Sequence, residues 1–356
     1  MPRHPRGSKK RIFVPLLVLQ SFIQTDIKIL SEEYDVRTGK CRSLVGYARA
    51  VTAMLRADLV FCWFGSIRFF PLVLLARLFG KPVLIVAGGY DLANVPEIGY
   101  GNMRPGFRRI VGRALFALAD VILCYSRSAR NEAIAAGISP KRMRVLHLGV
   151  DVPDSVPMSK FPFVLTVASI DKETLLRKGL LDVARIARRL ADVDFVLAGR
   201  GADPEATARM TAASPPNLRL VGYQEPEALA SLFARAAVYL QPSRHEAFGL
   251  SVAEAMAYGC AVVVGNRYSL PEIVGETGVL VDPEDDEVMC AAIREALQRP
   301  DPRLDAAARI RQLFLPERRA RELLKHVDAL LTSRGAASPL LEPAEDLVQR
   351  SGVGLQ

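Results

Sequence analysis

The segment Val238–Gly259, VYLQPSRHEAFGLSVAEAMAYG, contains a strand pattern, a loop and a helix pattern in direct succession. The run Val238–Gln241 is short and apolar, which is typical of a strand buried in a parallel sheet. The stretch Leu250–Tyr258 has helical periodicity and predicts a helix. The segment therefore reads as one strand–loop–helix unit of an α/β fold, with Glu246 in the loop and Glu254 in the second turn of the helix.

The same alternation of short apolar runs with helical patterns extends through both halves of the chain and predicts parallel sheets. In the first half, the strand candidates are Arg11–Leu17, Tyr34–Thr38, Leu59–Trp63, Pro82–Ala87, Val121–Tyr125 and Met143–His147. In the second half, they are Phe163–Ala168, Asp194–Ala198, Leu218–Val221, Val238–Gln241, Ala261–Val264 and Val279–Val281. Because the alternation occurs twice, we expect two doubly wound, Rossmann-like domains facing a central cleft, where ligands bind at the carboxyl ends of the strands.

Prolines interrupt the pattern within residues 151–162 and divide the chain into two predicted domains. The first domain is expected at residues 1–152. The second is expected at residues 160–333 and ends in a helical stretch at Arg303–Ser333. Residues 334–356 are rich in small and polar side chains and are expected to form a flexible tail.

The composition limits the class of protein. The chain has 356 residues, of which 50% are hydrophobic and 24% are charged, so it can bury large cores and is not disordered. Its five cysteines are scattered without a C-x-x-C pair, which argues against a zinc site and favours a reducing compartment. The net charge of +9 favours polyanionic partners, phosphates among them. The sequence has no uninterrupted apolar run of about 18 residues, so we expect no spanning helix.

The helix that carries Glu254 surrounds this carboxylate with small apolar side chains, an arrangement that is costly unless hydrogen-bond donors reach it. The vicinal diol of a ribose supplies two such donors. The free N–H groups where the helix begins, near Gly249, suit a phosphate. Glu246, in the preceding loop, would then lie near the group that the phosphate carries. The alternative is structural, with Glu246 capping the helix and Glu254 on a solvated face.

A second cluster, Arg177-Lys178-Gly179, follows the first strand of the second domain and is expected on the cleft side. The guanidinium and ammonium groups together can neutralise a diphosphate without a metal ion. A solvated loop pair is the alternative. The glycine turn that ends at Gly201 allows close approach to the backbone, although glycine turns end many strands.

Taken in order, these segments resemble the family 4 retaining glycosyltransferases (glycosyl transferases group 1), which have the GT-B fold. The resemblance rests on the E-x7-E pair Glu246 and Glu254, on Arg177-Lys178-Gly179, on Val196–Gly201 and on Pro271–Pro283. It implies a retaining glycosyltransferase that moves a sugar from a nucleoside-diphosphate sugar to an acceptor. It implies no metal ion and no cofactor.

The resemblance also implies residue roles, position by position. Glu254 would hold the ribose hydroxyls, the two cations would hold the diphosphate, and Glu246 would hold the donor sugar. The donor-binding residues that it implies are Glu254, Phe248, Gly249, Leu250 and Gly201. The catalytic residues that it implies are Glu246, Arg177 and Lys178.

The first domain departs from the family pattern near the expected transfer site, where many members carry a histidine. Here the sequence reads Val86-Ala87-Gly88-Gly89-Tyr90-Asp91. The two glycines would let an acceptor approach the backbone, and a tyrosine or aspartate side chain could face the cleft. The acceptor-binding candidates are therefore Gly88, Gly89, Tyr90 and Asp91, with a plain strand-end turn as the alternative.

The expected acceptor is a glycan or a lipid-linked molecule. Arg104–Ala119 has the pattern of a basic amphipathic helix, which suits an anionic membrane surface, although an ordinary domain helix would have the same pattern. We therefore expect a cytoplasmic protein with peripheral contact at the inner membrane face. The one D-x-D motif, Asp192–Asp194, lies at the amino end of its strand, away from the cleft, so no metal site is expected there. No nucleic-acid recognition motif is present.

Two alternatives to a glycosyltransferase belong to other classes of function. A nucleotide-dependent oxidoreductase needs G-x-G-x-x-G after its first strand, and Ile12–Ile23 contains no glycine. The remaining alternative is a catalytically silent GT-B-like protein that binds a nucleotide sugar or serves as a scaffold.

Overall fold

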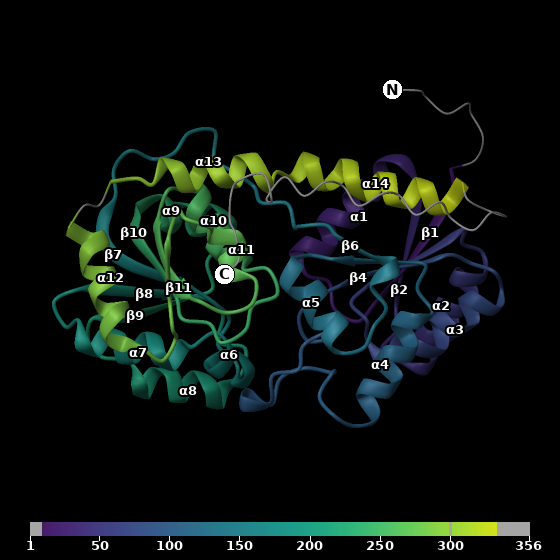
Figure 1. Ribbon diagram of the computed structural model, residues 1–356, viewed down its shortest axis with the longest axis horizontal. Coiled ribbons are helices and arrows are strands. Elements are labelled where there is room, and N and C mark those ends of the chain that lie inside the picture. The colour runs from purple at the N-terminus through teal and green to yellow at the C-terminus, as the bar shows by residue number, and fades with distance from the viewer. Residues whose placement is uncertain (1–8, 299–300, 333–356) are drawn as a thin grey trace.

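The computed structural model describes residues 9–298 and 301–332, so the expected tail at residues 334–356 lies outside the described residues. Two six-stranded parallel sheets lie side by side, and helices cover both (Figure 1). Every strand expected from the sequence is present within a few residues. The α/β fold with two doubly wound domains is therefore confirmed.

The first sheet has the strand order β2-β1-β3-β4-β5-β6. Its strands are β1 (Arg11–Leu16), β2 (Asp35–Lys40), β3 (Leu59–Trp63), β4 (Val83–Ala87), β5 (Val121–Cys124) and β6 (Met143–Val145). The helices between them are α1 (Ser21–Glu33), α2 (Leu44–Leu55), α3 (Phe70–Leu78), α4 (Phe107–Ala117) and α5 (Arg127–Ala135). α5 lies at the side of this domain that faces the second domain (Figure 1).

The second sheet has the order β12-β11-β10-β7-β8-β9. Its strands are β7 (Phe161–Val167), β8 (Asp194–Ala198), β9 (Leu218–Gly222), β10 (Ala236–Gln241), β11 (Ala261–Gly265) and β12 (Val279–Val281). Its helices are α6 (Lys172–Arg177), α7 (Leu180–Arg189), α8 (Pro204–Ala213), α9 (Pro226–Arg235), α10 (Leu250–Ala257), α11 (Leu270–Val274) and α12 (Asp286–Gln298).

The central strands of both sheets are buried along their whole length. β3, β4 and β10 expose no residue to solvent, because helices cover both faces of a parallel sheet. This burial explains why their sequences are continuous apolar runs rather than alternating ones. Parallel strands also end at the same edge of their sheet, so the loops after β3, β4, β7 and β10 meet between the domains.

The helical stretch expected at Arg303–Ser333 is divided into two helices, α13 (Leu304–Leu313) and α14 (Pro316–Thr332). The break precedes Pro316, whose ring removes a backbone donor and disfavours helical geometry at the residue before it. Pro316 instead opens the second helix, a position where its missing N–H costs nothing.

α14 packs on the first domain although it follows the second domain in sequence (Figure 1). The Arg319 guanidinium donates hydrogen bonds of 2.8 and 2.7 Å to the two carboxylate oxygens of Asp26 in α1. Both side chains are almost completely buried. The Tyr34 hydroxyl also bonds Asp328, at 2.5 Å. The domain division at residues 1–152 and 160–333 stays a prediction. It did not include the packing of the C-terminal helix α14 on the first domain.

Candidate active site

A cleft of about 920 Å³ lies between the two domains. It is lined by the loops that follow β1, β3 and β4 in the first domain and β7 and β10 in the second. Most of the residues predicted for the site line this cleft, namely Glu246, Arg177, Lys178, Glu254, Phe248, Gly249, Leu250, Gly88, Gly89, Tyr90 and Asp91. The fold therefore brings together residues that are far apart in the sequence.

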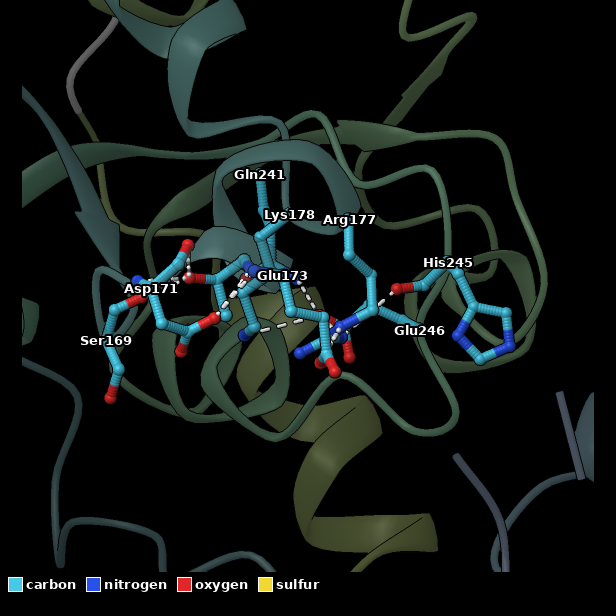
Figure 2. A network of polar contacts seen from close by, with 9 residues as sticks. Ser169, Asp171, Glu173, Arg177, Lys178, Gln241, His245 and Glu246 are labelled. Atoms are coloured by element: carbon cyan, nitrogen blue, oxygen red, sulfur yellow. Dashed lines mark hydrogen bonds and ion pairs between the residues drawn. The ribbon is translucent and has the colours of Figure 1, made fainter. Parts of the chain in front are cut away.

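Glu246 lies in the loop after β10, and three groups hold its Oε1 atom (Figure 2). The Gln241 side-chain amide donates a hydrogen bond of 3.0 Å. Lys178 Nζ lies at 3.2 Å and Arg177 Nη1 at 3.5 Å. Burial raises the pKa of the Glu246 carboxyl, but the charges of Lys178 and Arg177 outweigh burial and hold the pKa below its ordinary value. Glu246 is therefore an anion held between two cations.

Arg177 belongs to a short helix, α6, that the sequence pattern did not predict. The Asp171 side chain accepts hydrogen bonds from the backbone N–H groups of Glu173 and Thr174, and Thr174 completes a capping box. One turn later, Glu173 Oε1 lies 3.1 Å from Arg177 Nε. α6 thus presents Arg177 and its C-cap residue Lys178 to the cleft at a fixed angle (Figure 2).

The first domain also contacts Arg177. The Arg177 guanidinium lies over the ring of Tyr100, 5.3 Å from the ring centroid, which is a cation–π distance. Tyr100 itself lines the cleft. The predicted cationic pair is thus held from both domains, and neither Tyr100 nor Glu173 was among the predicted residues.

Helix α10 begins after Gly249, whose φ of 93° falls in the left-handed region that favours glycine. Glu254 extends from the second turn of α10 into the cleft. Burial raises the pKa of the Glu254 carboxyl to about 7, although Lys178 lowers it. Within the described part of the chain, no group donates a hydrogen bond to this carboxylate. Glu254 therefore keeps its capacity to accept hydrogen bonds from a ligand.

The four acceptor candidates lie at the end of β4, on the first-domain wall of the cleft. Asp91 is only 3% exposed. It accepts hydrogen bonds from the backbone N–H groups of Gly65, at 2.7 Å, and Gly88, at 3.2 Å. A side chain at Gly88 would collide with the Tyr125 ring, 2.5 Å from Cζ. Burial raises the pKa of Asp91 to about 7, against the lowering effect of these hydrogen bonds. Asp91 thus stabilises the turn that forms this part of the first-domain wall, and a direct contact with an acceptor stays a prediction.

One predicted donor residue lies elsewhere. Gly201 forms an isolated parallel bridge with Ile170, is exposed, and is not among the residues that line the cleft. Its contact with the donor stays a prediction. The D-x-D motif lies where it was expected, at the start of β8, and Asp192 pairs with Arg294 at 2.9 Å. Over residues 9–298 and 301–332, no cluster of three or more His, Cys, Asp or Glu residues is arranged to bind a metal ion.

The chain matches two protein families over adjacent segments. It matches Glycosyl transferases group 1 over residues 153–313 and Glycosyltransferase Family 4 over residues 28–153. It is 42% identical over 92 residues to O-antigen chain mannosyltransferase B of Escherichia coli, which covers 26% of this chain. It is 29% identical over 231 residues, or 60% of this chain, to a GDP-mannose-dependent alpha-(1-6)-phosphatidylinositol dimannoside mannosyltransferase of Mycobacterium tuberculosis. The matches span 24% and 59% of the lengths of these two curated relatives.

Solved structures match the fold at low sequence identity. Sucrose-phosphate synthase from Thermosynechococcus elongatus has a TM-score of 0.75 at 17% identity, with 90% of this chain and 99% of that chain covered. Anabaena HepE in complex with UDP and glucose has a TM-score of 0.70 at 16% identity, with the same coverage. Both domains and their arrangement are thus shared over nearly the whole chain. The chain belongs to glycosyltransferase family 4 (glycosyl transferases group 1) and has the GT-B fold.

Proposed function

We propose that this chain is a retaining glycosyltransferase that moves a sugar from a nucleoside-diphosphate sugar to an acceptor hydroxyl without a metal ion. One observation carries the proposal: the buried carboxylate of Glu246 lies between Lys178 and Arg177, 3.2 and 3.5 Å away, in the same cleft as Glu254. Family membership supports the same activity.

The donor diphosphate binds at the second-domain wall. Lys178 and Arg177 supply two positive charges, and the first backbone N–H groups of α10 supply donors and a partial positive charge. The ribose hydroxyls donate to the Glu254 carboxylate. The cations and the helix terminus can neutralise a diphosphate, so the reaction does not require a metal ion.

Donor binding exchanges the partners of the two cations. Without donor, Lys178 and Arg177 hold Glu246. A bound diphosphate competes for both cations, and the Glu246 carboxylate then accepts hydrogen bonds from hydroxyls of the donor sugar. The same cations stabilise the charge that develops on the departing diphosphate, which is where electrostatic stabilisation contributes most to the rate.

The transfer itself occurs on one face of the sugar. The acceptor oxygen forms a bond to the anomeric carbon on the face from which the diphosphate leaves, while the bond from that carbon to the phosphate oxygen breaks. The acceptor hydroxyl proton passes to the departing diphosphate. Because the new bond forms on the face that the diphosphate leaves, the anomeric configuration is retained. No covalent protein nucleophile is needed.

The acceptor binds against the first domain and is lipid-linked. This wall of the cleft carries apolar side chains, including Val18, Phe22, Phe64 and Ile67, next to the exposed Arg68. Apolar surface beside a cation suits an acceptor with a hydrocarbon portion and a phosphate. A glycan without a lipid is the other acceptor class, and an acceptor panel separates the two.

A lipid-linked acceptor would reach the cleft if the protein contacts the anionic inner face of a membrane. At the start of α4, Phe107 is 75% exposed and Ile110 is 68% exposed, beside the exposed Arg108. Exposed apolar side chains next to cations suit the surface of an anionic bilayer. In the part of the chain that the structure describes, no helix has the length and apolarity to span a bilayer.

The test is incubation of the chain with a panel of radiolabelled sugar nucleotides and acceptors, with and without EDTA. We expect transfer from one donor, an unchanged rate in EDTA, and retention of the anomeric configuration by NMR. Loss of turnover in Glu254→Ala supports the assignment. Donor binding without hydrolysis or transfer to any acceptor would instead favour a silent nucleotide-sugar-binding or scaffold protein.

A further inference from the structure

A contact between the domains reaches the loop that carries Glu246. His245, the residue before Glu246, is completely buried, and its Nε2 atom lies 3.0 Å from Oε1 of Glu132. Glu132 belongs to α5, a helix of the first domain. The first domain therefore contacts the residue adjacent to the proposed catalytic carboxylate.

The same helix holds the other side of this loop. The Ser126 hydroxyl, at the N-cap of α5, donates a hydrogen bond of 2.7 Å to the carbonyl of Ala247. Residues 245 and 247 flank Glu246, so α5 and its N-cap residue contact the chain on both sides of it, through the His245 side chain and the Ala247 carbonyl. In both contacts the first domain supplies the partner of a residue in the second domain, which carries Glu246 itself.

The backbone of His245 also contacts Arg177. The His245 carbonyl accepts a hydrogen bond of 3.3 Å from Arg177 Nη1, and the His245 N–H donates to the Arg177 carbonyl at 3.4 Å. In Figure 2 this carbonyl oxygen faces Arg177, while the imidazole ring points away from it. The imidazole ring of His245 therefore contacts the first domain, while its backbone contacts Arg177 in the proposed site.

Aromatic rings complete the enclosure of the imidazole. The Tyr100 ring of the first domain lies 5.1 Å from the His245 ring, and the Tyr268 ring of the second domain lies 4.3 Å away. Tyr100 also lies beneath the Arg177 guanidinium. Displacement of α5 relative to the second domain would thus disturb His245 and the neighbouring Glu246 together.

We propose that Glu132 is a positioning residue, which through His245 places Glu246 in its reactive geometry only when the two domains are in contact. The inference rests on the proposed transferase function. Nucleotide binding to the second domain does not need Glu132, because Lys178, Glu254 and the α10 terminus all lie in that domain, and Glu173 of α6 holds the Arg177 guanidinium at 3.1 Å. The chemical step does need it, since small displacements of reacting groups slow a reaction strongly.

The test compares Glu132→Ala with Glu132→Gln and with a control, Asn131→Ala, on an exposed position of the same helix. We expect Glu132→Ala to bind UDP or GDP within about twofold of the wild-type affinity by calorimetry. We expect its turnover number to fall roughly tenfold to hundredfold, the range that misplacement of reacting groups produces. Gln keeps an oxygen that accepts from Nε2–H, so Glu132→Gln should recover most of the turnover. Asn131→Ala should match wild type.

Hydrogen–deuterium exchange gives a readout that does not depend on activity. We expect the backbone amides of residues 244–248 to exchange faster in Glu132→Ala, and at the wild-type rate in the Gln and control variants. Wild-type exchange rates in Glu132→Ala would overturn the inference even if the protein turned over no sugar nucleotide. A parallel loss of nucleotide affinity and turnover would also overturn it. An active wild type with an equally active Glu132→Ala variant would leave the transferase function intact and refute the role of Glu132.

Discussion

Glu254 provides a test of the donor site through pH. Burial raises the pKa of its carboxyl to about 7 in the ligand-free protein, whereas an exposed glutamate titrates near 4.3. Both ribose hydroxyls can donate to the two carboxyl oxygens only when the group is ionised, and bonds to the ionised form are the stronger ones. A donor should therefore bind to the deprotonated protein, and its affinity should fall as the pH is lowered through 7.

The size of the effect follows from the ionised fraction. With a pKa of about 7, roughly 0.1 of the carboxyl groups are ionised at pH 6 and roughly 0.9 at pH 8, and the apparent dissociation constant is the intrinsic one divided by this fraction. The affinity should thus rise about tenfold between pH 6 and pH 8 and level off above that. The same shift means that the free protein is most stable below about pH 4.3 with respect to this group, and loses that stability as the pH rises toward 7.

Calorimetry with UDP-glucose and GDP-mannose from pH 6 to pH 8 measures this dependence. The diphosphate of a sugar nucleotide is esterified at both ends, so it does not titrate in this range as a terminal phosphate does. Glu254→Gln keeps the shape of the side chain and cannot ionise, so its profile should be flat, apart from what Asp91 in the same cleft contributes. Equal pH profiles for the wild type and Glu254→Gln would refute the role of Glu254 as the acceptor of the ribose hydroxyls.

Three further substitutions test the charged groups. Lys178→Ala should weaken the binding of UDP and of UDP-glucose by the same factor, about tenfold or more, because a hydrogen bond to a charged group contributes about 1.5–3 kcal/mol. Calorimetry that finds only one of the two ligands affected would contradict this. Glu246→Gln should cut transfer about 100-fold or more while UDP binds at least as tightly, since the carboxylate no longer competes for Lys178; lost UDP affinity would mean that Glu246 is misassigned. Arg319→Ala leaves Asp26 buried and unpaired, so the free energy of unfolding of this variant, measured in urea, should be lower than that of the wild type by about 3–5 kcal/mol. A change below about 1 kcal/mol would show that the pair does not stabilise the fold.

The parts of the fold that follow from local pattern were predictable. Buried parallel strands need continuous apolar runs, so β3, β4 and β10 are visible in the sequence. The carboxyl ends of such strands meet at one edge, and this rule was enough to predict that Glu246 and the Arg177–Lys178 pair share a cleft.

The sequence does contain a local signal for helix α6, which the periodicity of apolar residues did not reveal. Its six residues, Lys172–Arg177, are too few for a periodic apolar pattern. However, Asp171 lies three positions before Thr174, as in a capping box, and Glu173 lies four before Arg177, as in a helical ion pair. These spacings could have indicated a helix and a fixed direction for the arginine.

The contacts between domains left no such signal. Glu132 and Tyr100 reach the proposed site only because of how the two domains are oriented. A glutamate on a helix and a tyrosine in a loop are compatible with any surface position. No rule of spacing connects them to a loop more than a hundred residues away.

The closing helices explain how this orientation can be held. The chain passes between the domains twice, once in the segment after β6 and once between α13 and α14, and the backbone N–H of Val150 bonds the carbonyl of Phe314 at 2.8 Å. The two passages therefore lie side by side. Beyond the second one, the buried Arg319–Asp26 pair anchors α14 to the first domain. If the second domain moves relative to the first, both connecting segments must bend together, because α14 stays packed on the first domain. The relative position of the domains, and with it the distance from Glu132 to His245, thus depends on a helix whose sequence pattern gives its periodicity but not the domain on which it packs.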